Sequence, residues 1–170
     1  ITSDEPITGP EIEVLDGTTV LTDGTSSINF GTALVGGSLS KVFTVNNVGT
    51  TALTVQPLSV PDGFTIVSDF TVNQEIPTGS SATFEISVNT TSAATRTGTL
   101  QFFNDDTNEN PFNFTISATV AAPAPIIIDN GDAGFTRTGG FIPFAGQGFQ
   151  NDVHFAAGDS SGDTATYAFT

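Results

Sequence analysis

The chain has 170 residues with 18 acidic and 3 basic side chains, which gives a formal net charge of −15 at pH 7. Such a surface repels nucleic-acid phosphates and anionic lipid, and no run of about 20 apolar residues is present, so neither nucleic-acid binding nor membrane insertion is expected. Cysteine is absent, which excludes disulfides, thiol catalysis and thiolate metal sites.

The N-terminal part begins with a segment that has no regular pattern. Residues 1–10 contain two prolines and a glycine without hydrophobic periodicity, which predicts a flexible arm or linker. Residues 11–15 alternate glutamate with apolar side chains and predict a first short strand. A weaker apolar pair at residues 20–21 precedes an Asp-Gly turn at residues 23–24.

The clearest pattern of strands and turns in the chain lies between Ser27 and Gly49. We expect a short strand that ends at Phe30-Gly31, a turn at Gly36-Gly37, and a longer strand. The longer strand places three apolar side chains on one face: Leu39, Phe43 and Val45. This stretch therefore predicts two strands and the turns that bound them.

The middle of the chain repeats the strand pattern. Short strands are expected at residues 53–55 and 64–70, and strict alternation at residues 81–89 is repeated at 98–104 and 112–120. These strands are apolar on one face, are separated by turns, and show no helical period. The pattern predicts an all-β fold, an antiparallel Greek-key β-sandwich over residues 11–120.

An Ala/Pro segment at residues 121–125 interrupts every pattern and predicts a short, stiff linker. Beyond it, strands are expected at residues 126–128, at 153–157 and around Tyr167. A segment of this size without disulfides can scarcely bury a core of its own. Residues 126–170 are therefore expected to be an incomplete domain, a layer packed on the first domain, or a piece completed by another chain.

Several motifs between Pro10 and Val120 resemble the Hydin-like immunoglobulin-type repeat, whose bacterial versions are often called choice-of-anchor D domains. The residues that carry the resemblance are Ile28-Asn29-Phe30-Gly31, Val35-Gly36, Phe43 to Gly49, Leu53-Thr54-Val55, Phe64, Pro77-Thr78-Gly79, Gly98-Thr99-Leu100 and Ile116-Ser117-Ala118. The resemblance implies an immunoglobulin-like Greek-key sandwich of seven strands in a large surface or scaffolding protein. It implies no shared active site.

The tail looks like the front third of the golvesin C-terminal-like domain, a β-sandwich attached to secreted bacterial proteins. The residues that carry this second resemblance are Ile126 to Phe135, Val153 to Ala157 and Thr164 to Phe169. Phe141 stands where that family is expected to have tryptophan, and the later strands of such a domain are missing.

Two oxygen-rich segments are candidate calcium sites, because calcium prefers six to eight oxygen ligands. One is the loop with Asp105 and Asp106, flanked by Asn104, Asn108 and Glu109; the alternative is an acidic hairpin turn. The other comprises Asp129, Asn130 and Asp132, with Asp152 nearby, and its alternative is a set of Asx turns. Neither spacing matches an EF-hand loop. No other cofactor is expected.

Candidates for catalysis and ligand binding are sparse. His154, the only histidine, lies two residues after Asp152, and a triad with Ser160 or Ser161 would need a geometry that spacing does not establish. A surface histidine is the ordinary explanation, and we expect no enzyme activity. Phe141 and Phe149 are candidates for stacking on sugar, with use in a core or an interface as the alternative.

Two functions follow as hypotheses. The first is a non-catalytic structural or adhesive module of a secreted or cell-surface bacterial protein, which contacts other copies or domains of the same protein and assembles into fibres by strand exchange. The second is a carbohydrate-binding accessory module of a larger secreted enzyme, with polysaccharide as its partner. Both predict an extracellular or cell-surface location.

Overall fold

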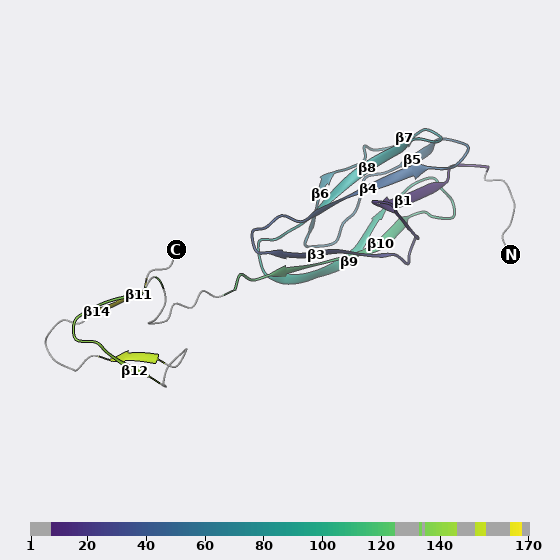
Figure 1. Ribbon diagram of the computed structural model, residues 1–170. Coiled ribbons are helices and arrows are strands. Elements are labelled where there is room, and N and C mark those ends of the chain that lie inside the picture. The colour runs from purple at the N-terminus through teal and green to yellow at the C-terminus, as the bar shows by residue number, and fades with distance from the viewer. Residues whose placement is uncertain (1–7, 125–132, 134, 146–151, 156–163, 168–170) are drawn as a thin grey trace. The chain divides into compact units, whose positions relative to one another are not determined.

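The computed structural model describes residues 8–124, 133, 135–145, 152–155 and 164–167, and every regular element among them is a β-strand. The chain divides into two compact units, Ile1–Pro123 and Ala124–Thr170, so the division falls within the Ala/Pro segment. The described residues of the first unit form ten strands (Figure 1): β1 Ile12–Asp16, β2 Thr19–Leu21, β3 Ser27–Leu34, β4 Ser40–Asn47, β5 Leu53–Val55, β6 Phe64–Ser68, β7 Gln74–Ile76, β8 Ser81–Val88, β9 Ala94–Phe102 and β10 Phe112–Ala121.

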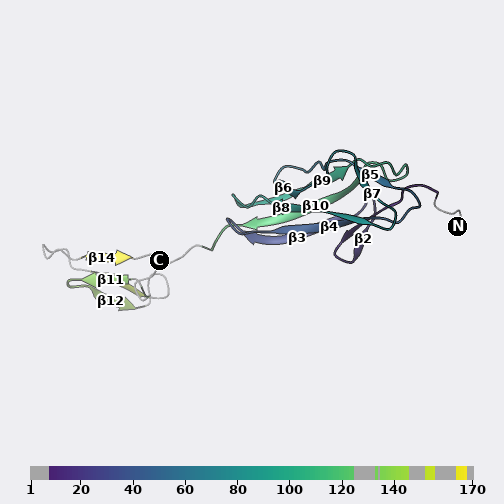
Figure 2. The same ribbon diagram turned by 90° about the horizontal axis from the view of Figure 1, so that it is seen from above.

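Two main sheets face each other in this unit. The first has the strand order β2-β1-β4-β8-β6, and the second has the order β3-β10-β9. A short β5–β7 ladder is separate from both. Seen from above in Figure 2, β6 and β9 lie along one side of the sandwich, while β2 and β3 lie along the other. The unit is an immunoglobulin-like β-sandwich, as the sequence predicts.

Phenylalanine fills the space between the sheets. Phe43 and Phe84 lie on neighbouring strands of one sheet, and their rings stack with centroids 5.0 Å apart. Phe102 and Phe112 form the corresponding pair in the other sheet at 5.8 Å, and Phe70 packs edge-on against Phe84 at 5.5 Å. All five are buried. The alternation that the sequence shows at residues 81–89 and 112–120 is the alternation between this core and solvent.

The pairing of β3 differs from the sequence prediction in two ways. The strand does not stop at Gly31 but continues to Leu34, and it pairs with β10 in parallel rather than antiparallel fashion. The register between β3 and β10 shifts at this point, and Gly31 has φ 99°, a backbone conformation that favours glycine. The Asn29 side chain accepts a hydrogen bond from the Gly31 N–H at 2.8 Å. The Phe-Gly pair thus marks a bulge, not the end of a strand.

Two other strands depart from the sequence expectation. β7 was not expected, because three residues with a single buried side chain, Ile76, are too few to show a period. β9 begins at Ala94, four residues before the expected Gly98. Its first half carries Thr95, Arg96 and Thr97, which lack the alternating large apolar residues that reveal a strand.

The second unit contributes four described strands in two ladders. β11 (Phe135–Thr138) pairs antiparallel with β14 (Thr164–Tyr167), and β12 (Ile142–Ala145) pairs antiparallel with β13 (Asp152–Phe155). Phe135 and Tyr167 face each other with ring centroids 5.2 Å apart. The expected strand at residues 126–128 lies outside the described residues.

Candidate functional site

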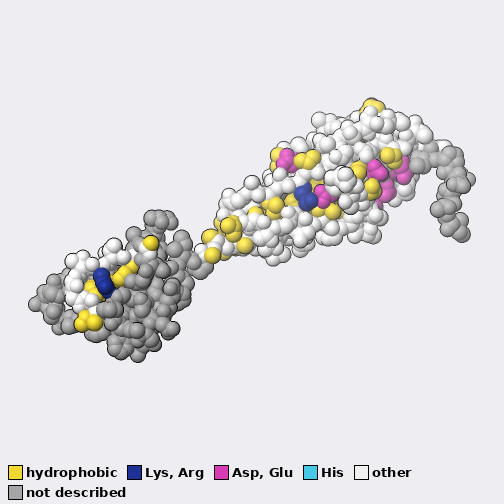
Figure 3. Space-filling model, viewed as in Figure 1, with side chains coloured by type: hydrophobic (Ala, Val, Ile, Leu, Met, Phe, Trp, Pro, Cys, Tyr) yellow, Lys and Arg dark blue, Asp and Glu magenta, His cyan; other side chains and the backbone are white. Residues whose placement is uncertain are grey.

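Three carboxylates converge at the end of the sandwich where β1 begins. Glu11 immediately precedes β1, whereas Asp106 and Glu109 come from the loop between β9 and β10. Each offers one oxygen, and these oxygens all lie within 4.8 Å of one another. We call Glu11, Asp106 and Glu109 the acidic cluster. Figure 3 shows acidic side chains gathered near this end of the first unit.

Asp106 is the structural centre of the acidic cluster. It is only 2% exposed. One carboxylate oxygen accepts a hydrogen bond from the Ile12 N–H at 3.0 Å, and the other accepts from the Asn108 N–H at 3.3 Å. The Asn104 side chain in turn accepts from the Asp106 N–H at 2.8 Å. These bonds satisfy a buried charge and fasten the β9–β10 loop to the first strand.

The other two members of the cluster, Glu11 and Glu109, have pKa values that their surroundings raise. Burial raises the pKa of Glu109, and the neighbouring charges of Asp106, Glu11 and Asp23 raise it further. Burial and the Asp106 charge likewise raise the pKa of Glu11. The shifts come from desolvation and from other carboxylates, so each group is held in a setting that favours its protonated form.

Chemically, the acidic cluster can bind a proton or a metal ion. Either one reduces the repulsion among three carboxylates, and oxygen ligands suit hard divalent cations. The two oxygens of Asp106 are already engaged by main-chain N–H groups. Further ligands for a cation would therefore come mainly from the two glutamates and from water.

The sequence found part of this cluster. Asp106 and Glu109 belong to the oxygen-rich loop that it indicated, but Asp105 points elsewhere and accepts a hydrogen bond from the Thr54 N–H at 2.7 Å. Glu11 was missed, because it is more than 90 positions from the loop. No local spacing connects it to Asp106, and only the packing of the two sheets brings the start of β1 to the β9–β10 loop.

The remaining candidates lie in or near the second unit. Phe141 is half-buried just before β12. Asp152 and His154 belong to β13, whose side chains are not described. The other candidate residues lie outside the described residues and stay predictions: Asp129, Asn130, Asp132, Phe149, Ser160 and Ser161.

A shallow depression of about 350 Å³ is present on the first unit. Its lining consists of two segments, residues 46–49 and 78–81. The buried Asn47 donates from its side-chain amide to the carbonyl oxygens of Thr51 and Ile76, both at 2.8 Å, and accepts from the Gly49 N–H at 3.0 Å. This side chain therefore ties the loop after β4 to the end of β7. The lining contains no carboxylate, imidazole or amine that could act as an acid or base.

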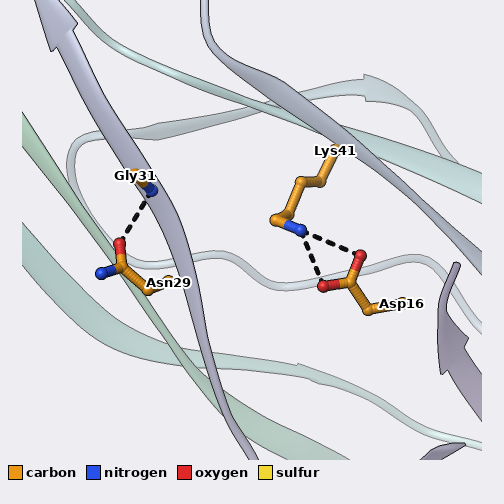
Figure 4. A network of polar contacts seen from close by, with 4 residues as sticks. All are labelled: Asp16, Asn29, Gly31 and Lys41. Atoms are coloured by element: carbon orange, nitrogen blue, oxygen red, sulfur yellow. Dashed lines mark hydrogen bonds and ion pairs between the residues drawn. The ribbon is translucent and has the colours of Figure 1, made fainter. Parts of the chain in front are cut away.

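The ion pair between Lys41 and Asp16 lies at the side of the sandwich near β3. The Lys41 Nζ is 2.7 Å from one Asp16 oxygen and 3.0 Å from the other, and both side chains are about a quarter exposed. Figure 4 shows the pair beside the Asn29–Gly31 contact of β3. It is the only ion pair among the residues that the structure describes. The two charges of this pair neutralise each other and join β1 to β4.

The comparisons with known proteins decide the family. The model of the HYDIN/CFA65/VesB-like Ig-like domain matches residues 23–119, more than half of the chain. The chain belongs to this family. Membership of this Ig-like domain family confirms the Hydin-like resemblance over the first unit. The choice-of-anchor D and golvesin-like assignments stay predictions. No curated protein matches the chain.

Several solved structures resemble the chain at low sequence identity. A Porphyromonas gingivalis W83 protein of unknown function matches with a TM-score of 0.51 and 15% identity, over 69% of this chain and 50% of that one. The chain thus spans half the length of that protein. A PapD-like domain of human CEP192 matches with a TM-score of 0.49 and 14% identity, over 71% of this chain and 94% of that one. The Vibrio cholerae VesB protease matches with a TM-score of 0.41 and 19% identity, over 55% of this chain and 30% of that one.

A search of the described residues found no helix of the length and hydropathy needed to span a bilayer.

Proposed function

We propose that the chain is a non-catalytic structural module of a larger bacterial protein at the cell surface or outside the cell. Its Ig-like domain acts as a spacer that transmits force along its length. The larger protein would use such a spacer in adhesion and in fibres that assemble by strand exchange. The composition supports this location, because scarce lysine together with abundant Thr, Ser, Asn, Asp and Gly is typical of secreted bacterial surface proteins.

The observation that carries the proposal is the path of the chain through the sandwich. Residues 9–12 lie at one end, where the Gly9 carbonyl accepts from the Thr50 N–H at 2.9 Å and Ile12 contacts Asp106. The last strand, β10, finishes at the opposite end, where the Ala121 carbonyl accepts from the Val35 N–H at 2.9 Å (Figure 1). Neighbouring domains would therefore attach at opposite ends of a rod-like unit.

The pairing of β10 suits a load applied along this path. β10 is the central strand of its sheet, bonded to β3 on one side and to β9 on the other. Nine residue pairs join it to β9 without a register shift. A pull on Ala121 runs parallel to these strands, so that many ladder hydrogen bonds must fail together rather than one after another.

The interior of the first unit is built around a large apolar core cluster. The buried side chains between the sheets are apolar, and in the described part of the chain every buried side-chain polar atom has a hydrogen-bond partner. Such a core resists deformation because it is closely packed. Stiffness and inertness are the properties that a spacer needs.

Single-molecule force spectroscopy tests the proposal. The whole chain would be held by handles at its two termini and stretched. We expect the Ig-like domain to unfold in one event that releases a contour length of about 40 nm, from at most about 3.6 Å for each of residues 11–121. Extension of this domain without a resolved force peak would overturn the spacer role.

A further inference from the structure

The four outer edges of the two sheets are not equally protected. β2 is only three residues long, β3 carries the bulge at Gly31, and β6 has a register shift between Ile66 and Ser68. Short edge strands and bulges are features that prevent further strand pairing. The fourth edge strand, β9, has nine residues and no irregularity in its pairing with β10.

The direction of the main-chain groups of β9 follows from the ladder. The Thr115 N–H of β10 donates to the Ser26 carbonyl and so points toward β3, away from Thr99, its partner in β9. Because this direction alternates along antiparallel strands, the N–H and C=O groups of Thr95, Thr97 and Thr99 point away from β10. No hydrogen bond joins these groups to any described residue.

The other half of this edge is already covered. Ser59 exchanges two hydrogen bonds with Gln101, at 2.8 and 3.0 Å, and the Gln56 N–H donates to the Phe103 carbonyl at 2.9 Å. Pro61 ends this cover, because proline has no N–H to donate. Its ring packs against Gly98, where a Cβ would lie only 2.4 Å from the proline side chain. The hydrogen-bonded pairing thus ends at Gln101, although the partner segment still packs against Gly98 and, at Gly63, against the Arg96 side chain.

Charge makes this edge the approachable one for a second copy. Two chains of net charge −15 repel each other. Residues 86–104, which include all of β9, contain Arg96 and no acidic residue. The Arg96 guanidinium donates to the Asn89 and Ser92 carbonyls, at 2.9 and 3.4 Å, and so fixes the turn before β9. The strand itself is therefore ordered and carries no acidic residue, and the nearest acidic residue of the covering segment is Asp62, between Pro61 and Gly63.

We propose that the β9 edge pairs with the β9 edge of a second copy of this chain. The two strands run antiparallel about a two-fold axis at Thr97, with Thr97 opposite its own copy and Thr95 opposite Thr99. All three positions are hydrogen-bonding pairs, so about six main-chain hydrogen bonds form across the axis. The two three-stranded sheets become one sheet of six strands. The inference rests on the proposed structural role, to which it adds the partner and the contact surface.

The threonine side chains fit this arrangement. Thr95, Thr97 and Thr99 are exposed on the outer face of the sheet. Across the axis they would form a row of threonine pairs, and β-branched cross-strand neighbours stabilise sheet pairing. No charged side chain would be brought opposite a like charge at these three positions.

Disulfide cross-linking tests the pairing, since the chain has no cysteine of its own. In the proposed dimer the two Thr97→Cys residues have Cα atoms about 5.5 Å apart, within the range of disulfides. Thr32→Cys, which is also exposed and lies on the bulged edge strand β3, is the matched control. In the full chain under mild oxidation, we expect Thr97→Cys to form linked dimers at least about tenfold faster than Thr32→Cys.

The register is tested separately. Thr95→Cys alone should form few dimers, because its two copies would lie about 13 Å apart along the strands. A mixture of the Thr95→Cys and Thr99→Cys chains should form mixed dimers readily. Linked dimers of Thr95→Cys alone, formed as fast as the mixed ones, would overturn the register.

Equal rates for Thr97→Cys and Thr32→Cys would overturn the interface, as would an unmodified chain that sediments as a monomer up to about 1 mM. Neither result touches the spacer role, because the force measurement is made on single molecules. Conversely, a chain that fails to resist force but cross-links at Thr97→Cys would retain the interface and lose the proposed function.

Discussion

The core of the Ig-like domain and the end that carries the acidic cluster are built on opposite principles. The core gathers phenylalanines such as Phe43 and Phe84, which lose their contact with water and pack ring against ring. The acidic cluster gathers like charges and depends on hydrogen bonds to Asp106 to hold them. The packing between the sheets therefore supplies most of the stability, whereas the contribution of the acidic end to stability depends on solution conditions.

Truncation of a core ring should have the largest effect. Phe84→Ala removes the partner of Phe43, Phe70 and Phe102 and should cost about 3–5 kcal/mol of unfolding free energy. Phe103→Ala is the matched control, since Phe103 is 54% exposed, and it should change stability by less than about 0.5 kcal/mol. Denaturant unfolding measures both. Similar losses for the two variants would contradict the location of the core.

The second prediction concerns the hydrogen bonds that hold the acidic end. Asp106→Ala leaves the N–H groups of Ile12 and Asn108 without their acceptors and should destabilise the domain by about 1–3 kcal/mol. The adjacent Asp105→Ala removes an exposed acceptor of the Thr54 N–H and should cost less than about 1 kcal/mol. An Asp106→Ala variant as stable as the parent chain would show that repulsion outweighs these bonds.

The pH dependence of the acidic end is a smaller effect with a definite sign. The pKa of Glu109 is raised above 4.5 in the folded chain, so the folded chain binds this proton more tightly than the unfolded chain. The resulting stabilisation is complete below about pH 4.5 and is lost as pH rises through the folded pKa. Glu109→Gln stays uncharged and should raise Tm at pH 7, with a gain in the free energy of unfolding of less than about 1 kcal/mol. It should also flatten the dependence of Tm on pH between pH 5 and pH 7.

Glu75→Gln controls for the change in net charge, because Glu75 is exposed on β7, outside the cluster. It should leave the shape of the pH profile as it is in the parent chain. Equal profiles for Glu109→Gln and Glu75→Gln would mean that overall charge, not the acidic cluster, sets the pH dependence.

Calcium at the β9–β10 loop stays a prediction, and melting temperatures test it. A bound ion stabilises the folded chain by RT ln(1 + [L]/Kd), so Tm should be higher in calcium than in chelator, and Glu109→Gln should reduce the difference. Magnesium at the same concentration controls for ionic screening. A Tm that is the same in calcium and in chelator would remove the calcium prediction.

Much of the fold could be predicted from the sequence because one physical pattern dominates it. Where a strand buries one face, as residues 81–88 and 112–121 do, large apolar residues alternate with polar ones and mark the strand. Where a strand buries little, as β9 does before Gly98, the pattern is too weak to mark it. The parallel partner of β3 could not be predicted, because alternation shows which face is buried but not which neighbour a strand has.

The candidate site was predictable only in part, for a related reason. The loop residues Asp106 and Glu109 are close in sequence and were found together, whereas Glu11 reaches them through the sheet topology. The sequence also did not separate Asp105 from Asp106, although one is exposed and the other buried. Neighbouring residues in a loop share composition, and only the fold determines which of them faces inward.

The direction of pulling tests the central claim, that the domain carries load along the axis between its two ends. Cysteines in place of Thr8 and Ala124 would load the ladders of β10 in shear. Cysteines in place of Ser92 and Ala122 would instead open the β9–β10 ladder from one end, beside the paired residues Ala94 and Val120. The account predicts a clearly higher unfolding force for the first pair of attachment points, and an equal or lower force for that pair would contradict it.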